Sequence, residues 1–194
     1  MMAAPLSGIT NSPFIGIDNF HIAELLTDPD TGAATYGDMV SFPWLRSVAV
    51  EPTNAEETLY ADNKSVAVAN AVSEYGLTIE TATLPLEYKA WLLGHQYDGT
   101  TGIMTVSSDD AAPYFGIAFE STKQNGKKRF VKFVKVQFAE PSETSQTKEE
   151  NITFNTPTME ATAIYRNDGV VLLQADEEAD GYDAATGTAW YTSM

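Results

Sequence analysis

Short runs rich in Ile, Val, Thr, Tyr and Phe recur along the chain, and Gly, Pro, Asn or Asp separates one run from the next. β-Branched and aromatic residues favour strands and the separating residues favour turns, so this rhythm predicts a mainly β fold. In 77–81 the residues also alternate between apolar and polar, as a half-buried strand requires. The strands that we expect are Phe14–Ala23, Tyr36–Phe42, Leu45–Glu51, Val66–Val72, Gly76–Thr83, Gly102–Ser107, Tyr114–Ser121, Lys128–Ala139, Thr158–Tyr165 and Val170–Ala175.

One segment interrupts the strand pattern. Pro85 suits the first turn of a helix, where its missing N–H costs nothing, and Gly94 suits the left-handed residue that ends one. Apolar residues between them recur at helical spacing, so the sequence predicts a short helix over about 85–93 that flanks the sheet. The sequence also allows a second short helix over Ala184–Tyr191.

Turns and loops can be placed as well. Asn125-Gly126 and Asn167-Asp168-Gly169 each predict a hairpin turn. Long polar stretches without apolar periodicity predict loops, and loops of such length in a small domain usually carry function or move. These loops are Thr27–Tyr36, Pro52–Lys64 and Glu140–Asn151.

The chain length bounds the organisation. A chain of 194 residues has the size of a single domain and can bury a core without disulfides or metals. We therefore expect one domain over 1–194, with a flexible N-terminal arm (1–12) and an acidic C-terminal segment (176–194). No apolar run reaches the roughly 20 residues of a membrane span, and the N-terminus lacks the order of a signal peptide. These features predict a soluble protein that is not exported.

Residues that carry common enzyme chemistry are scarce. The chain has no cysteine, which excludes thiolate catalysis, disulfides and iron–sulfur ligation. Its two histidines, His21 and His95, fit structural roles better than ligand roles, because one lies in a strand pattern and the other follows the helix. Phosphate-binding glycine loops and a nucleophile elbow are absent, and the acidic clusters lack the spacing of a calcium loop. The sequence therefore predicts neither an enzyme nor a cofactor or metal site.

Acidic residues dominate the charge, with 27 Asp and Glu against 11 Lys and Arg and a formal net charge of −16. Such a surface repels phosphates, which disfavours binding of DNA by phosphate attraction. Most of the cations fall between Lys123 and Lys148, where some alternate with aromatic residues. That pattern can bind single-stranded nucleic acid. The interpretation that we favour is a strand whose cations, Lys132 and Lys135 among them, protect an edge or meet acids on a neighbouring strand or subunit.

Several blocks occur in a recognisable order: Leu59–Asn63 (Leu-Tyr-Ala-Asp-Asn), Leu84–His95, Ala112–Phe119 and Thr147–Ile152 (Thr-Lys-Glu-Glu-Asn-Ile). In these blocks the chain resembles the major tail proteins, or tail tube proteins, of long-tailed bacteriophages (siphophages) of Gram-positive hosts. The likeness extends over 10–175.

The resemblance implies a β-sandwich or barrel with one short flanking helix and long assembly loops. It implies a structural virion protein of the tail, synthesised in the host cytoplasm, whose copies self-assemble into stacked hexameric rings around a channel for DNA ejection. The expected partners are further copies and other tail proteins (tape measure, tail terminator and distal tail proteins), without a membrane or a cofactor. DNA passes without specific binding, and an acidic or neutral bore fits this role because duplex DNA carries one charge per about 1.7 Å.

Under this interpretation, acids on the solvent faces of well-patterned strands, Glu51 and Glu80 first, are candidates for the lumen. Leu59–Asn63 can equally be a local turn device, and Trp44 and Trp91 are expected in the core. The candidate contacts between subunits lie in the loops and on the basic strand: Asp28, Asp30, Tyr60, Asp62, Lys132, Lys135, Glu149 and Glu150.

An alternative function uses aromatic side chains. Exposed aromatics such as Tyr36, Tyr97 and Trp190 would suit a ligand-binding β-sandwich, for example a carbohydrate-binding or adhesive module. The two functions differ in their oligomeric state, because the module would act as a monomer.

Overall fold

The computed structural model describes residues 11–61, 64–142 and 156–194, with the backbone alone for 56–61 and 64–70. The described part of the chain is mainly β, as the strand pattern predicts. Its strands are β1 (Phe14–Thr27), β2 (Thr35–Tyr36), β3 (Val40–Ser41), β4 (Leu45–Ala61), β5 (Lys64–Thr81), β6 (Gln96–Asp98), β7 (Ile103–Thr105), β8 (Tyr114–Lys123), β9 (Lys128–Phe138), β10 (Thr158–Ala163) and β11 (Leu172–Asp176), and its helices are α1 (Leu86–Leu93) and α2 (Ala184–Ala189).

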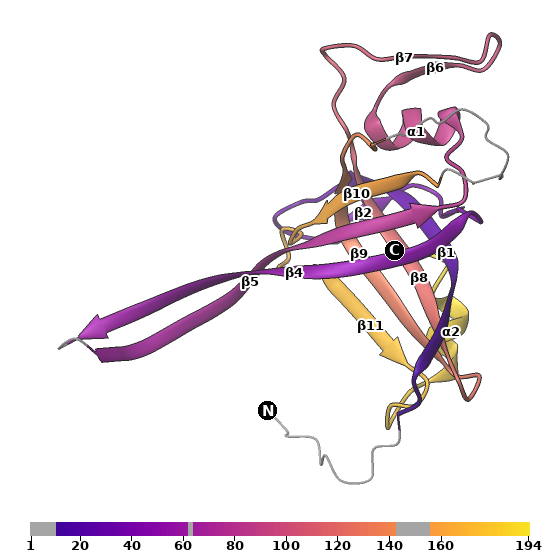
Figure 1. Ribbon diagram of the computed structural model, residues 1–194. Helices are drawn as coiled ribbons and strands as arrows, with labels where there is room; N and C mark the ends of the chain where they lie inside the picture. The colour runs from indigo at the N-terminus through magenta and orange to yellow at the C-terminus, as the bar shows by residue number, and fades with distance from the viewer. Residues whose placement is uncertain (1–10, 62–63, 143–155) are drawn as a thin grey trace, which may run out of the picture.

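Within the described residues, nine strands form one sheet in the order β2-β1-β8-β9-β10-β5-β4, with β3 paired to β1 and β11 to β9. β9 connects two parts of the sheet. Its first half pairs with β11, and its end pairs with β10. In Figure 1, β10, β5 and β4 cross over the long strands β8 and β9, so the sheet folds back on itself. Side chains from β5 and β10 meet side chains from β8 and β9 in one core, among them Ile79, Met159, Ile117 and Phe133.

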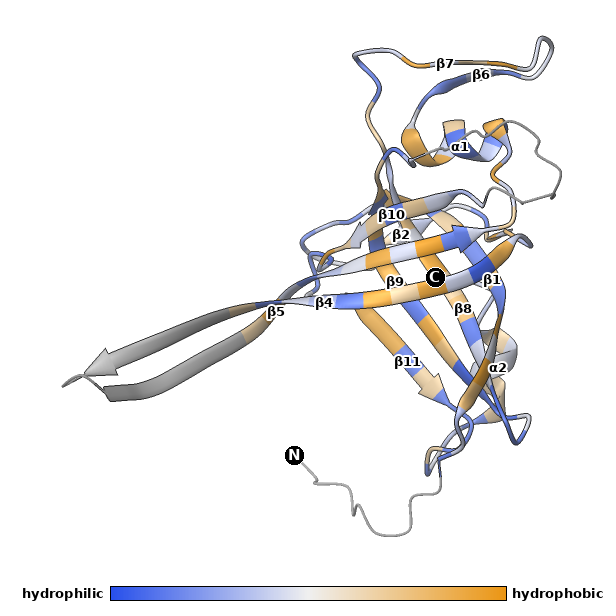
Figure 2. Cartoon of the chain, viewed as in Figure 1, coloured by the Kyte–Doolittle hydropathy of each residue, from blue (hydrophilic) through white to orange (hydrophobic). Residues whose placement is uncertain are grey.

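Alternation along the strands builds this core. Apolar and polar residues follow one another in the body part of β4 and β5 (Figure 2), whereas β8 and β9 are buried along most of their length. In β5, Leu77 and Ile79 are buried and Thr78 is exposed, which confirms the predicted alternation. Each buried side chain of this size contributes about 2 kcal/mol relative to an exposed one.

The predicted loop over Pro52–Lys64 is wrong. β4 continues to Ala61 and β5 begins at Lys64, and the two strands pair from Leu45 opposite Thr81 to Ala61 opposite Lys64. Pro52 signals a loop because proline has no N–H for a strand ladder. β4 is the last strand of the sheet, however, and an edge strand accepts proline because one of its sides makes no ladder bonds.

Smaller differences concern strand boundaries. The expected strand Tyr36–Phe42 is two short strands, β2 and β3, which both pair with β1. The expected strand Gly102–Ser107 shortens to β7, which pairs with β6 outside the main sheet. Asn167-Asp168-Gly169 turns the chain, but β10 and β11 each pair with β9 and not with one another in the described sheet.

The glycines predicted to end the helix and to form the first hairpin turn do so in the structure. α1 ends at Gly94, which has a φ of 72° and donates its N–H to the carbonyl groups of Ala90 and Trp91. Leu92 and Leu93 enter the core, so α1 closes one end of the folded sheet, and β6 and β7 lie beyond it (Figure 1). Gly126, with a φ of 80°, forms the tight turn between β8 and β9.

Candidate functional site

Four glutamates share the outer face of β4, β5 and β10, and we call this surface the acidic face. Glu51 pairs with Gly76 and Glu160 with Thr78, and residues two apart in a strand lie on the same side. The residues between them, such as Ile79 and Met159, are buried in the core. The members of the acidic face are Glu51, Glu74, Glu80 and Glu160.

The acidic face is only lightly neutralised. Arg46 lies near Glu80, with 3.9 Å between the guanidinium nitrogen and the carboxylate oxygen, and both side chains are about half exposed. Ser47 donates a hydrogen bond to the same carboxylate over 3.3 Å. A surface ion pair of this kind contributes little, so the face keeps its negative character.

Sequence reasoning found part of this face. Glu51 and Glu80, the two acids that it selected, do lie on one side of the sheet. It missed Glu74 and Glu160, although the alternation in Thr158–Ala161 places Glu160 opposite the apolar residues. The sequence alone does not reveal the strand register that places Glu160 beside β5.

A two-stranded ribbon extends from the acidic face. β10 pairs with β5 from Tyr75 to Glu80, so beyond Tyr75 the partner of β5 among the described strands is β4 alone. The ribbon comprises 53–61 and 64–74 and projects away from the other strands in Figure 1. At the base, Ser73 donates its hydroxyl to the carbonyl of Thr53 over 3.0 Å. About nine residues of strand reach about 30 Å, and an isolated hairpin is marginally stable in water.

The candidate contacts Asp28 and Lys135 bind one another. Lys135 Nζ lies 2.7 Å from Asp28 Oδ2, and both side chains are largely buried. The backbone N–H of Asn167 also donates to Asp28, and the side-chain amide of Asn167 donates to Asp30 over 3.2 Å. These contacts fix the end of β1 to the turn after β10 inside a single subunit. Asp30 remains exposed.

The other candidate contacts divide into three groups. Lys132 is 6% exposed and lies in β9, an interior strand, which corrects the expectation that the basic strand is a sheet edge. Tyr60 lies in the ribbon, paired through its backbone with Ser65, rather than in a loop. Asp62, Glu149 and Glu150 lie outside the described residues.

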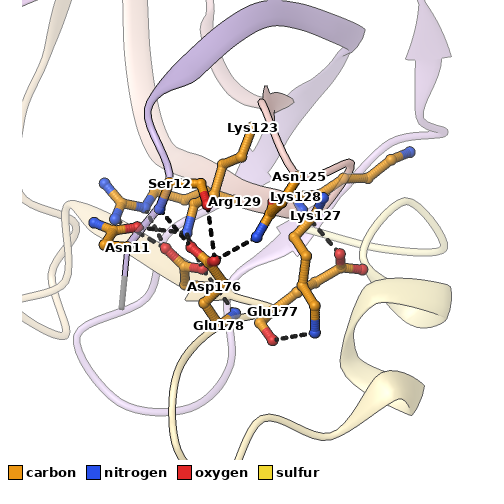
Figure 3. Close-up of polar contacts among 10 residues, drawn as sticks. All are labelled: Asn11, Ser12, Lys123, Asn125, Lys127, Lys128, Arg129, Asp176, Glu177 and Glu178. Atoms are coloured by element: carbon orange, nitrogen blue, oxygen red, sulfur yellow. Dashed lines mark hydrogen bonds and ion pairs between the residues drawn. The ribbon is translucent and has the colours of Figure 1, made fainter. Parts of the chain in front are cut away.

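A charged cluster ties Asn11 and Ser12, and the residues at the end of β11, to the β8–β9 turn (Figure 3). Lys123 is fully buried, and its Nζ lies 2.6 Å from carboxylate oxygens of both Asp176 and Glu178. The same ammonium group donates to Asn11 over 2.8 Å, and the N–H of Ser12 donates to Glu178 over 3.1 Å. The last two residues of the N-terminal arm expected over 1–12 are therefore held to the start of the acidic C-terminal segment, which is not what a flexible arm implies at these positions.

The charges in this cluster stabilise one another. Burial alone would lower the pKa of Lys123, but hydrogen bonds to the carboxylates of Asp176 and Glu178 raise it. Hydrogen bonds from Lys123 and from the backbone of Ser12 hold the pKa of Glu178 below its usual range. Arg129 adds a second ion pair to Asp176 across β9 and β11, at 2.8 Å. This is the neighbouring-strand role that the basic strand was expected to allow.

A second cluster surrounds His95 just after α1. Its Nδ1 lies 2.8 Å from Asp110 Oδ2 and its Nε2 lies 3.2 Å from Glu140 Oε2. Burial opposes the charged ring, but the hydrogen bonds to Glu140 and Asp110 raise the pKa of His95. Lys89 also contacts Glu140, at 2.9 Å. His95 is thus a structural histidine, as predicted from its position.

The three aromatic residues named for the alternative function do not together form an exposed platform. Trp190 is 8% exposed, contrary to expectation, and the hydroxyl of Tyr36 donates to the carbonyl of Val134 over 2.6 Å. Tyr97 is exposed. Trp44 and Trp91 pack against the core, which confirms their predicted place.

Two further features concern metal binding and membrane crossing in the described residues alone. In 11–61, 64–142 and 156–194 no group of three or more His, Cys, Asp or Glu side chains could hold a metal ion. None of the helices in these ranges is long and apolar enough to cross a membrane.

Of the comparisons with known proteins, a family model shows the family of this chain. A family model described as "Phage tail tube protein" matches residues 51–186, which include the acidic face, the ribbon and α1. A solved structure, the anti-feeding prophage cap (AFP tube terminating cap), aligns over 90% of this chain and 99% of its own chain, with 10% sequence identity and a TM-score of 0.45. No curated protein matches the chain.

Proposed function

This chain belongs to the phage tail tube protein family, and we propose that its copies form hexameric rings that stack into a hollow tube for the ejection of viral DNA. Membership of the family makes it a structural component of a phage tail. The observation that carries the finer proposal is the ribbon, because two strands that leave the body unsupported need a partner to be stable.

The acidic face is the proposed lining of the bore. A lining that passes DNA must not adhere to it, and carboxylates such as those of Glu51 and Glu160 repel phosphate. A basic lining would release counterions from the DNA and hold it in place. Glu51 and Glu160 are exposed in the single subunit, as a lining requires.

The ribbon and the open sheet edges are the proposed assembly elements. Among the described strands, β4 leaves one edge of the sheet unpaired in its body part, Leu45–Glu51, and unpaired edges add strands from neighbours. Contact of such an edge with a different surface of the next copy is head-to-tail, and head-to-tail contacts close into rings when the rotation allows. The ribbon would then reach a further copy, in the same ring or the next.

Further parts of the proposal concern the virion. We propose that the phage is long-tailed and infects a Gram-positive host, that the subunit is made in the host cytoplasm, and that the tube contacts the tape measure, tail terminator and distal tail proteins. The sequence blocks named above support this part.

Electron microscopy of the concentrated protein tests assembly directly. The expected result is rings or tubes of uniform width, formed by the protein alone or with its tail partners. Particles that stay monomeric at every concentration and with every tail partner would contradict the proposal.

Thiol labelling tests which face lines the bore, because the chain has no cysteine of its own. Glu51→Cys should react with a bulky polymer-linked maleimide in the free subunit and become at least tenfold less reactive in tubes. Asp109→Cys, an exposed position before β8, is the matched control and should stay reactive in both states. Equal reactivity of Glu51→Cys in tubes and free subunits would place the acidic face elsewhere.

A further inference from the structure

The last residues of the chain cover a second face of the sheet, opposite the main core. We call 182–194 the C-terminal cover. Trp190 packs with Phe130 and Ala118, and Tyr182, Tyr191 and Met194 pack around them. The ring of Tyr182 stacks on Phe130 and the ring of Tyr191 lies 4.7 Å from His21.

The sheet face under the cover is unusually polar for a buried surface. Glu120 is 3% exposed and Lys132 is 6% exposed. Glu120 is paired with Lys128 at 2.5 Å and accepts a hydrogen bond from Asn19 over 2.9 Å, so its charge is compensated by the sheet itself. Charged groups at these positions suit a surface that can exist uncovered better than a permanent core.

The cover completes this face only in part. Lys132 donates to the carbonyl of Ser193 over 2.6 Å and lies 4.7 Å from the centre of the Trp190 ring. Among the described side chains it has no carboxylate partner, and burial lowers its pKa. The indole N–H of Trp190 is buried without a hydrogen-bond partner in the described residues. A buried donor without a partner is destabilising because it has lost its hydrogen bonds to water, so the closed cover carries a penalty.

The cover is also attached weakly. The backbone hydrogen bonds that its residues donate in the described structure stay within 179–192 and include no strand pairing. Its hydrogen bonds to the body come from two side chains, Lys132 to Ser193 and Tyr191 to Glu120. α2 is short, contains Gly187 and buries none of its residues. Segments with few backbone bonds to the body open at low free energy.

A hinge precedes the cover. Asp176 and Glu178 are held by Lys123, so the fixed part of the chain ends there. Gly181 follows three residues later with a φ of 83°, and glycine, which has no Cβ, can leave this conformation for others at little steric cost. The cover can therefore move as a unit about 179–181 while the charged cluster stays intact.

We propose that the C-terminal cover is exchanged between copies, so that 182–194 of one subunit occupies the β8–β9 face of the next. The occupant is a second copy because the cover already fits this face by its ring contacts and by the Lys132 and Glu120 hydrogen bonds. Exchange of an identical segment forms the same contacts between chains at little cost. The inference rests on the proposed function only in that assembly brings the copies together.

Cross-linking between introduced thiols tests the exchange. Asp38 and Thr192 line the same hollow at the end of the cover, and the chain has no cysteine of its own. The full-length variants Asp38→Cys and Thr192→Cys are mixed, concentrated under assembly conditions and treated with a short bismaleimide. Exchange predicts a product of twice the chain mass, at least fivefold above the control mixture of Asp38→Cys with Asp109→Cys.

The double variant in one chain provides the reference for the closed state. In dilute solution it should give an intrachain product, since the cover then lies on its own subunit. Lys132→Met, which keeps the side-chain stem but removes the bond to Ser193 in the closed and exchanged states alike, should make the cover open faster, so that the mixed product forms at least twofold faster. Tubes without the mixed product would overturn the exchange and leave the proposed function standing. Protein that neither assembles nor forms the mixed product would contradict both.

Discussion

Asp28 and Lys135 form an ion pair of 2.7 Å between the loop after β1 and the end of β9. Their side chains are 11% and 14% exposed, so the pair is largely removed from water. Sequence reasoning assigned both residues to contacts between subunits, and the structure shows that they satisfy one another within a subunit. Their substitution should therefore act first on the stability of the single chain.

Lys135→Met is expected to lower the free energy of unfolding by roughly 3 kcal/mol, because it leaves the carboxylate of Asp28 without its cation. Arg46→Met is the matched control, since Arg46 and Glu80 form an exposed pair. An exposed pair contributes at most about 1 kcal/mol. Urea unfolding of the dilute subunit measures both, and equal effects would contradict the distinction.

The cluster around His95 predicts a loss of stability at alkaline pH. The pKa of His95 is raised above its ordinary value of 6.5, so the stabilisation is complete below 6.5 and is lost as the pH rises through the higher pKa of the folded state. The groups that face the ring are Asp110, Glu140 and, through Glu140, Lys89.

His95→Gln should therefore be less stable than the wild type by roughly 1–3 kcal/mol at pH 6, and by less at pH 9. Chemical unfolding at the two pH values measures the difference. Glu87→Gln, a substitution of an exposed acid at the start of α1, serves as the control and should track the wild type. A gap that stays constant between pH 6 and pH 9 would refute the role of the charged ring.

The charged cluster at Lys123 predicts the opposite pH dependence. The pKa values of Asp176 and Glu178 are lowered from 3.8 and 4.5, so their stabilisation is present above these values and is lost as the pH falls through the folded-state values. Lys123→Met should cost roughly 3–5 kcal/mol at pH 7, because it leaves two carboxylates beside an apolar side chain.

The same substitution should reduce the acid sensitivity of unfolding between pH 7 and pH 3. It should also speed proteolysis near Ser12, since Glu178 would lose the cation that positions it. Lys127→Met, at an exposed position in the same turn region, is the control and should leave both readouts unchanged. Wild-type acid sensitivity in Lys123→Met would mean that other carboxylates control acid unfolding.

Gly94 predicts a purely steric effect. Its φ is 72°, and a Cβ at this position would overlap the carbonyl oxygen of Ala111. Gly94→Ala should therefore cost at least about 2 kcal/mol, from the left-handed conformation and the overlap together. Gly99→Ala meets open space and should be nearly neutral. Thermal unfolding separates the two variants.

Local signals in the sequence predicted local structure well. The limits of α1 follow from Pro85 and Gly94, and the β8–β9 turn follows from Asn125-Gly126, because each depends on backbone conformations that few residues adopt. The buried and exposed sides of β5 follow from alternation alone. Each of these features is determined within about ten residues of chain.

Features that depend on distant residues could not be predicted. The ribbon could not be predicted from the sequence, because Pro52 indicates the end of a strand unless that strand is known to lie at the edge of a sheet. Lys132 was assigned to a surface because nothing near it indicates that Ser193 and Trp190 lie above it. For the acidic face, the side of each glutamate was readable in its own strand, but the order β10-β5-β4 that joins them was not.

The same two backbones form the acidic face and the ribbon. β4 and β5 run from Leu45 and Thr81 without a break into the projecting part, past an irregular step at Thr53 and Asn54. Mechanical load on the tip of the ribbon would thus travel along covalent bonds into the body, rather than through side-chain packing. In the tube that we propose, the stiffness of the wall and the contact of the ribbon with a neighbouring copy would be coupled, and a change in twist at that step would alter both.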